Sequence, residues 1–260
     1  DGKKYTYEEY KTLVASEQTD KDGNLVLLYT NDPDAHYTYI ERAKSKGYDV
    51  LLMDGELDVH IMSQAEQKSM EKEKNSEDKL RFVCIESDTI ENIIRKEEST
   101  KDNYSDEQKE GLRKAFENLL PSSEDKLRYF VTCEATSADA LPVFLTQNEF
   151  MRRMKEMSAH QQGMSFYGNM PDQSNLVINT AHPLIQELVG KQKSEEVQEE
   201  VEKKGEGDAP STKETVIKTV YTLDGEDERI KQLIDIALLA SGQLKGEALA
   251  KFVNRSVELL

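Results

Sequence analysis

The sequence predicts an α+β protein, in which a small α/β unit with parallel strands precedes a mixed domain that ends in a helical hairpin. Two observations predict this fold class. Short apolar runs alternate with segments whose apolar residues recur every three or four positions, which is typical of strands alternating with amphipathic helices. Residues 227–260 then carry two helical patterns in succession, with glycines between them, which predicts a hairpin of two helices.

The first unit alternates helix and strand. Apolar residues from Tyr7 to Val14 recur at helical spacing, and Leu25 to Tyr29 is a short apolar run that predicts a buried strand. A second helical pattern begins at Tyr37 and ends at Gly47, and Val50 to Met53 forms the next strand. Because a helix joins the two strands, we expect them to pair in parallel with a right-handed crossover.

We place the domain boundary near residue 75, because residues 66–79 are almost entirely charged and polar and indicate a solvated helix or a hinge. The first domain then covers residues 1–75 and the second covers residues 76–260. In the second, strands are expected over 81–85, 127–132, 141–146 and 176–178, and helices over 88–95, 105–120, 148–159 and 183–189. Ser105 and Gln108 fit a capping box at the start of a helix.

Residues 191–215 are rich in Glu and Lys and contain Gly205, Gly207 and Pro210. Such a segment has too little apolar surface to offset the conformational entropy that ordering would remove. We therefore expect residues 191–215 to be a flexible charged linker, disordered or loosely helical.

The formal net charge of −17 limits the partners of this protein. An acidic surface repels phosphate backbones and anionic membranes, and no basic stripe with interleaved aromatic residues offsets the charge, so we expect neither as a partner. No run approaches the roughly 20 apolar residues that a membrane span requires. Cys84 and Cys133 lie inside apolar runs, where a thiol usually acts as a small buried hydrophobe. These features predict a cytoplasmic protein, and the opening Asp1-Gly2 suggests a piece of a longer chain.

The sequence contains no clear catalytic motif. His36, His60, His160 and His182 are scattered, form no HExxH or CxxC-type metal pair, and are not close in sequence to either cysteine. The stretch from Asp20 to Asn24 is interpreted as a turn, because its glycine is too early for a calcium loop. We expect no catalytic residue, cofactor or metal site in this chain, and an unrecognised hydrolase is the least favoured interpretation.

The helix that Asn148 caps carries an apolar stripe with spacing i, i+1, i+4 and i+7. The stripe consists of Phe150, Met151, Met154 and Met157. A methionine stripe at helical spacing generally faces the core, and the chain would then be a structural scaffold. Against this, flexible thioether side chains recur on surfaces that accept many different apolar partners. Periodicity alone leaves both interpretations open.

The terminal hairpin also has two interpretations. It packs back onto its own domain, or it pairs with the hairpin of a second chain in a four-helix bundle. Its large side chains, at about 1.5–3 kcal/mol each when fully buried, favour finding another surface. The long charged linker before it favours a second chain. The residues expected at that interface are Ile230, Leu233, Ile234, Ala237, Leu238, Leu249, Phe252, Val253, Val257 and Leu260.

Several segments together resemble the ninety-kilodalton heat-shock chaperones, the heat shock protein 90 family, and most closely its bacterial form. Leu233 to Ala240 and Phe252 to Arg255 are similar to the C-terminal dimerisation helices of this family. Asn148 to Met154 and Gly47 to Asp58 match further segments. The order and spacing of these segments agree over nearly the whole chain.

The resemblance implies that residues 1–75 are the last α/β subdomain of a chaperone's middle domain and that the remainder is its C-terminal dimerisation domain. It implies a homodimer whose methionine-bearing helix contacts unfolded or partly folded client proteins through Phe150, Met151, Met154 and Met157. The family binds ATP and Mg²⁺ in an upstream domain. The resemblance therefore implies that this chain itself neither binds nor hydrolyses ATP.

The sequence departs from the family pattern in three places. His60 stands where a second client-contacting patch often has tryptophan, which puts contact there in doubt. The chain ends at Leu260 without the Met-Glu-Glu-Val-Asp tail of eukaryotic relatives, so no tetratricopeptide-repeat cochaperone is expected. Residues 191–215 look like an insertion relative to shorter bacterial relatives.

Overall fold

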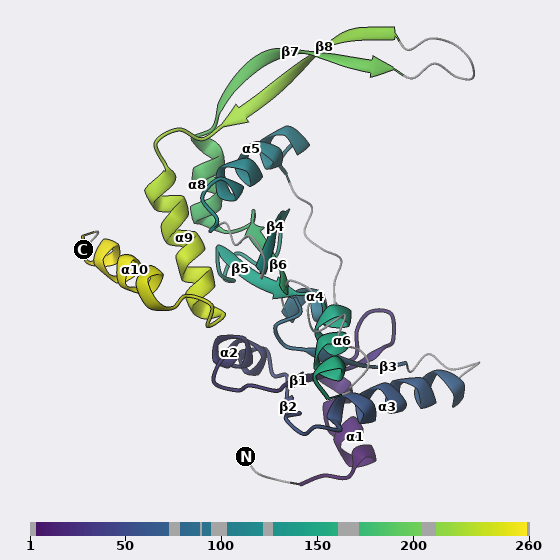
Figure 1. Ribbon diagram of the computed structural model, residues 1–260. Coiled ribbons are helices and arrows are strands. Elements are labelled where there is room, and N and C mark those ends of the chain that lie inside the picture. Colours follow the sequence, from purple (N-terminus) through teal and green to yellow (C-terminus); the bar gives the residue numbers. More distant parts are fainter. Residues whose placement is uncertain are drawn as a thin grey trace.

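Figure 1 presents the computed structural model, which describes residues 4–72, 79–88, 90–94, 103–121, 127–160, 172–203 and 212–258. The described chain forms two units, each built around a three-stranded sheet, and a two-stranded hairpin that projects away from the second unit (Figure 1). The predicted α+β fold class is confirmed. None of the helices in the described ranges is long and apolar enough to cross a membrane.

The first unit contains α1 (Tyr7–Gln18), β1 (Leu25–Thr30), α2 (Tyr37–Ser45), β2 (Val50–Leu52), α3 (Asp58–Lys72), β3 (Leu80–Cys84) and α4 (Ile90–Ile93). Its strands pair in parallel in the order β2-β1-β3, which confirms the predicted parallel pair. Successive residues of β1 face opposite sides of the sheet. Val26 and Leu28 pack with α2, whereas Leu27 and Tyr29 pack with α1 and α3.

The boundary predicted near residue 75 falls outside the described residues, but it lies too early to separate the two sheets. β3, which we assigned to the second domain, pairs with β1 along its whole length. Ile85, Ile90, Ile93 and Ile94 belong to the core of the first unit as well. The first unit therefore extends to residue 94. The extent of the first unit depends on strand pairing between distant segments, which the local sequence does not show. The polar composition of residues 66–79 reflects in part the solvated end of α3.

The second unit contains α5 (Asp106–Glu117), β4 (Leu127–Glu134), β5 (Val143–Gln147), α6 (Glu149–His160), β6 (Asp172–Asn179), α8 (Pro183–Gly190), α9 (Asp227–Ala240) and α10 (Gly246–Glu258). Its strand order is β4-β6-β5, with β4 parallel and β5 antiparallel to β6. Side chains from α5, α8 and α9 cover this sheet in one core. The predicted capping box is confirmed, since the Ser105 hydroxyl accepts from the Gln108 N–H at 3.3 Å and the Gln108 side chain accepts from the Ser105 N–H at 3.1 Å.

The expectation of a disordered or loosely helical linker is wrong for most of residues 191–215. β7 (Lys193–Lys203) and β8 (Thr212–Thr222) form an antiparallel ladder from the pair Lys193–Thr222 to the pair Lys203–Thr212. The ladder satisfies backbone hydrogen bonds, although none of its side chains with a described burial is buried, and β8 is rich in β-branched residues that suit a strand. The range 191–215 ends inside β8, so its composition does not include most of the β-branched residues of that strand.

The hairpin is attached to the second unit by a close approach between α5 and β8. A Cβ atom added to Gly111 of α5 would lie 2.3 Å from the backbone oxygen of Tyr221. No side chain larger than hydrogen fits there without movement. Only glycine lets the helix backbone come this near to the strand.

Candidate functional site

Helix α6 carries the predicted methionine stripe, and it begins where the sequence analysis placed it. The Asn148 side chain accepts a hydrogen bond from the Met151 N–H at 3.1 Å and so caps the helix. In the chain α6 follows β5 of the second unit directly. In space it lies against the first unit, beside α3 (Figure 1). The helix therefore connects the two units.

The Glu149 carboxylate is inserted among donors of the first unit. It accepts hydrogen bonds from the Tyr29 hydroxyl at 2.6 Å, from the Cys84 N–H at 3.1 Å and from the Ser87 hydroxyl at 2.5 Å. Arg153, one turn further along α6, donates to the same carboxylate through Nε at 2.6 Å. These donors offset the loss of hydration that a partly buried carboxylate suffers.

Arg153 joins α6 to α3 and β3. Its guanidinium nitrogens donate to the two Glu66 oxygens at 2.8 and 3.2 Å and to the Phe82 carbonyl at 2.6 Å. Glu66 in turn accepts from the Phe82 N–H at 2.7 Å. Burial lowers the pKa of Arg153, but the hydrogen bonds and charges of Glu66 and Glu149 outweigh it and leave this pKa above its usual value. We call Glu66, Glu149 and Arg153 the anchor network.

Arg152 completes the inward side of the helix. Its guanidinium lies 5.0 Å from the centre of the Tyr29 ring, and one of its nitrogens donates to the Tyr29 hydroxyl. The Arg152 residue is only 9% exposed. A cation is attracted to the negative face of an aromatic ring, so this contact further stabilises the packing of α6 against the first unit.

The apolar side of α6 points away from the anchor network. Phe150 is 64% exposed, although Arg152 two residues later is buried. Met151, Met154 and Met157 are half-buried, and none of them belongs to the core clusters found among the described residues. α6 is therefore an amphipathic helix that buries its charged side and presents its apolar side. A cavity of about 600 Å³ lies beside the helix on the side of the anchor network, because Glu66, Glu149 and Arg153 line it together with Phe150.

No histidine is close in sequence to a cysteine, but the fold brings one histidine near Cys84. His36, Cys84 and Glu86 offer potential metal-ligand atoms that lie within 4.8 Å of one another. They meet because His36 follows β1, whereas Cys84 and Glu86 lie at the end of β3, and the carboxyl ends of parallel strands share one edge. Sequence spacing alone could not show this contact.

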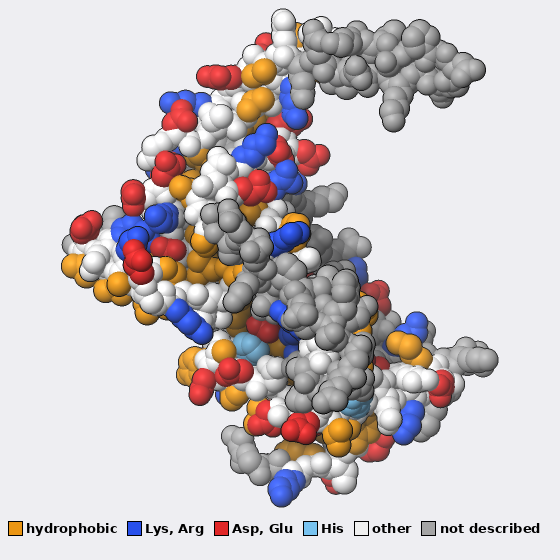
Figure 2. Space-filling model, viewed as in Figure 1, with side chains coloured by type: hydrophobic (Ala, Val, Ile, Leu, Met, Phe, Trp, Pro, Cys, Tyr) orange, Lys and Arg blue, Asp and Glu red, His pale blue; other side chains and the backbone are white. Residues whose placement is uncertain are grey.

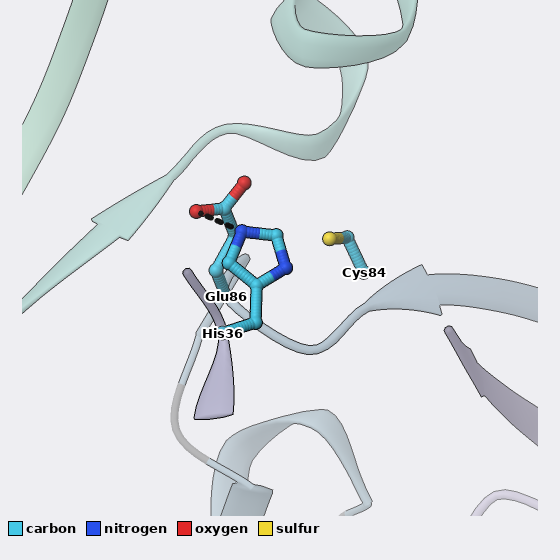
Figure 3. A group of neighbouring side chains, drawn as sticks. All are labelled: His36, Cys84 and Glu86. Carbon is cyan, nitrogen blue, oxygen red and sulfur yellow. Dashed lines mark ion pairs between the residues drawn. The ribbon is translucent and has the colours of Figure 1, made fainter. Parts of the chain in front are cut away.

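Hydrogen bonding between protein groups accounts for this cluster. The Nδ1 atom of His36 lies 2.8 Å from the Thr30 hydroxyl, and its Nε2 atom lies 3.0 Å from the Glu86 carboxylate. Figure 3 shows the Cys84 thiol and the Glu86 carboxylate on different sides of the imidazole ring. A metal ion bound through His36 would have to replace one of these two hydrogen bonds. We interpret the cluster as a hydrogen-bonded buried histidine.

The terminal hairpin is present as predicted, with Gly242 and Gly246 at positive φ in the turn. Five predicted interface residues, however, lie in the core of their own unit. These are Ile230, Leu233, Ile234, Ala237 and Leu238. The interface role assigned to them is corrected, because α9 uses its apolar stripe to cover the sheet of the same chain. Helical spacing identifies a stripe but does not identify the surface that covers it.

Helix α10 differs from α9, because none of its described residues is buried. Val253 is 49% and Val257 is 65% exposed, and Leu249 and Phe252 are half-buried. Figure 2 shows hydrophobic side chains in a row along the edge of the molecule where α10 lies. Arg255 fixes the helix to α9 by pairing with Asp235 and by donating to Gln232 at 2.9 Å. The remaining predicted residue, Leu260, lies outside the described residues.

Comparison with known proteins identifies the family. The family model described as Hsp90 protein matches residues 30–238. This chain belongs to the Hsp90 family. It is 42% identical to a protein named chaperone protein htpG from Bacteroides fragilis and 43% identical to one named chaperone protein HtpG from Porphyromonas gingivalis, in each case over its full length. It spans 42% of the length of these relatives. The resemblance to bacterial heat-shock chaperones is thereby confirmed.

In this Hsp90 chain the apolar stripe of α6 can be recognised from the sequence, whereas the anchor network cannot. One local signal was present, because Glu149 and Arg153 stand four positions apart and such pairs meet on a helix. That spacing predicts an exposed ion pair. Glu66, which makes the pair an anchor, comes from a distant helix and carries no recognisable motif.

Proposed function

We propose that this chain is the homodimerising and client-contacting part of an ATP-dependent cytoplasmic chaperone. The orientation of α6 supports this most strongly. A protein that binds exposed apolar segments of other proteins needs an apolar surface that its own fold does not cover, and α6 leaves Phe150 exposed while its arginines are held inside. In this proposal ATP and Mg²⁺ act outside this chain, and the described residues have no catalytic, cofactor or metal role.

Client contact is tested by replacing Phe150, Met154 and Met157 together by Ser. The matched control replaces Leu13 and Ile217 by Ser, which are 52% and 62% exposed on other elements. Fluorescence anisotropy measures the affinity for a permanently unfolded protein, reduced and carboxymethylated α-lactalbumin. We expect the α6 variant to bind about a hundredfold more weakly, since three apolar contacts of about 1 kcal/mol each are lost and about 1.4 kcal/mol corresponds to a factor of ten. Unchanged binding would refute the client role.

Self-association through α10 is the second part of the proposal. Its exposed side offers an apolar surface that a second copy of the same hairpin can cover in a four-helix bundle, and Leu239 of α9 is 44% exposed as well. Deleting both terminal helices is a poor test, because α9 belongs to the core of the second unit. Substitution on the exposed side of α10 is cleaner.

We would therefore replace Val253 and Val257 by Glu and measure the mass in solution by light scattering over a range of concentrations. The control replaces Val197 and Val216 on the β7–β8 hairpin, both 44% exposed, by Glu. We expect the α10 variant to be a monomer and the control a dimer, because burying four added carboxylates at a two-fold interface is strongly unfavourable. Dimers of unchanged strength in the α10 variant would place the interface elsewhere.

The alternative is a scaffold that assembles without contacting clients and keeps its methionine stripe covered. It requires the stripe to be protected from solvent, which the exposure of Phe150 does not favour. Rapid oxidation of Met154 and Met157 by hydrogen peroxide in the folded protein would argue against it. Slow oxidation, at the rate of the fully buried Met62, would favour it.

A further inference from the structure

The anchor network ties the apolar helix to a unit other than the one that precedes it in the chain. Glu149 and Arg153 use the Tyr29 hydroxyl, the Cys84 and Ser87 donors, the Glu66 carboxylate and the Phe82 carbonyl. All of these belong to the first unit or to the turn that follows β3. α6 is thus held by the elements β1, β3 and α3, although its backbone continues from β5 of the second unit.

We infer that Glu66 and Glu149 are positioning residues for client contact. Through Arg153 they hold α6 with its apolar side outward and fix that side in place relative to the first α/β unit. The inference rests on the proposed client role of α6. The inference extends the client role by assigning a function to two acidic residues that are not proposed to contact the client. It also implies that any movement of the first unit relative to the second carries the client-contacting side with it.

The geometry of the network supports a positioning role. A guanidinium that donates to both oxygens of one carboxylate and to a carbonyl has little rotational freedom, unlike a single ion pair. The Arg153 and Glu66 side chains are only 14% and 17% exposed, so their charges are partly shielded from solvent and interact more strongly than an exposed pair. If Glu66 loses its charge, the partly buried Arg153 guanidinium keeps the Phe82 carbonyl as an acceptor but has only the Glu149 carboxylate left in the anchor network to balance its charge. Turning α6 toward solvent is then the simplest way to rehydrate it, and that turn moves Phe150.

The test uses Glu66→Gln, Arg153→Met and the double variant, each in the full chain. Glu187→Gln is the matched control, because Glu187 also binds both nitrogens of one arginine, Arg229, at 2.8 Å each but lies far from α6 in the chain and is exposed. Binding of carboxymethylated α-lactalbumin is measured by anisotropy, and hydrogen exchange reports on α6 and on β5 and β6 separately. Arg153→Lys keeps the charge and serves as the conservative variant if Arg153→Met folds poorly.

We expect each single substitution to weaken binding about tenfold, which corresponds to α6 being correctly placed about one tenth of the time. The double variant should bind no more weakly than the worse single variant, because both residues act through one interaction. Exchange should accelerate in α6 and stay unchanged in β5 and β6. Arg153→Lys should lose less affinity than Arg153→Met, and the control should bind like the parent.

Three results would overturn the inference in distinguishable ways. If all anchor variants bind like the parent while the α6 serine variant binds weakly, the positioning role is wrong and the client role stands. If the serine variant also binds like the parent, both are wrong. Additive losses in the double variant, with exchange accelerated throughout the second unit, would mean that the network only stabilises the fold.

Discussion

Replacing Gly111 by Ala should loosen the attachment of the β7–β8 hairpin. The new Cβ would lie 2.3 Å from the Tyr221 oxygen and 2.9 Å from two of its carbon atoms, so α5 and β8 must separate by about 1 Å to reach ordinary contact. Overpacking typically costs about 1–3 kcal/mol and occasionally more, and because the nearest atoms here are backbone atoms that cannot swing aside, we expect about 2–4 kcal/mol at this site. Alanine regains about 1 kcal/mol over glycine as a helix former. The net loss of unfolding free energy should be about 1–3 kcal/mol.

Thermal denaturation followed by circular dichroism measures this loss. A chain of this size loses about 2–4 °C in Tm per kcal/mol, which predicts a decrease of about 2–12 °C. Gly190→Ala is the matched control, since Gly190 ends α8 with nothing within 4 Å of an added Cβ, and its Tm should stay the same or rise slightly. Hydrogen exchange should accelerate in β8. A Gly111→Ala protein as stable as its parent would refute the close approach of helix and strand.

Three further predictions follow from single contacts. Hydrogen bonds from Arg229 and Lys191 lower the pKa of Glu187 to about 2. The charged carboxylate therefore stabilises the folded chain above its ordinary pKa near 4.5, and this stabilisation is lost as the pH falls toward 2. The free energy of unfolding, measured between about pH 5 and pH 2, should depend less on pH in Glu187→Gln than in the parent. Asp235→Ala leaves the Arg255 guanidinium partly buried without its carboxylate, and should cost about 3–5 kcal/mol of the docking of α10, measured as faster hydrogen exchange in α10 and weaker dimers. His36→Leu removes the hydrogen-bond partner of Thr30 and Glu86, and should lower the unfolding free energy measured in urea by about 1–3 kcal/mol. If Zn²⁺ raises the Tm of the parent and this rise is absent in His36→Leu, the cluster binds a metal and the hydrogen-bonded interpretation is wrong.

Features fixed by neighbouring residues could be predicted from the sequence. The Ser105 and Gln108 cap and the turn glycines of the terminal hairpin depend on contacts within a few positions, and the apolar run of a short strand is visible locally although its partners lie elsewhere. Features fixed by distant pairing could not. β3 looked like the start of a new domain because its partner β1 lies more than fifty residues earlier, and α9 looked unpartnered because the sheet that it covers precedes the β7–β8 hairpin.

The orientation of α6 shows that apolar spacing can identify the apolar side of a helix without showing whether that side is buried. A stripe at helical spacing is ordinarily the buried side of a helix. In α6 the opposite side is buried, because Glu149 and Arg153 find fixed partners in Glu66, the Phe82 carbonyl and the Cys84 N–H, and these hydrogen bonds offset the loss of hydration of the charges. Those partners come from the other unit and leave no mark in the local sequence. Since the charged side is satisfied by the fold, the side with Phe150 remains uncovered, and its solvent exposure is a consequence of where the charges bind.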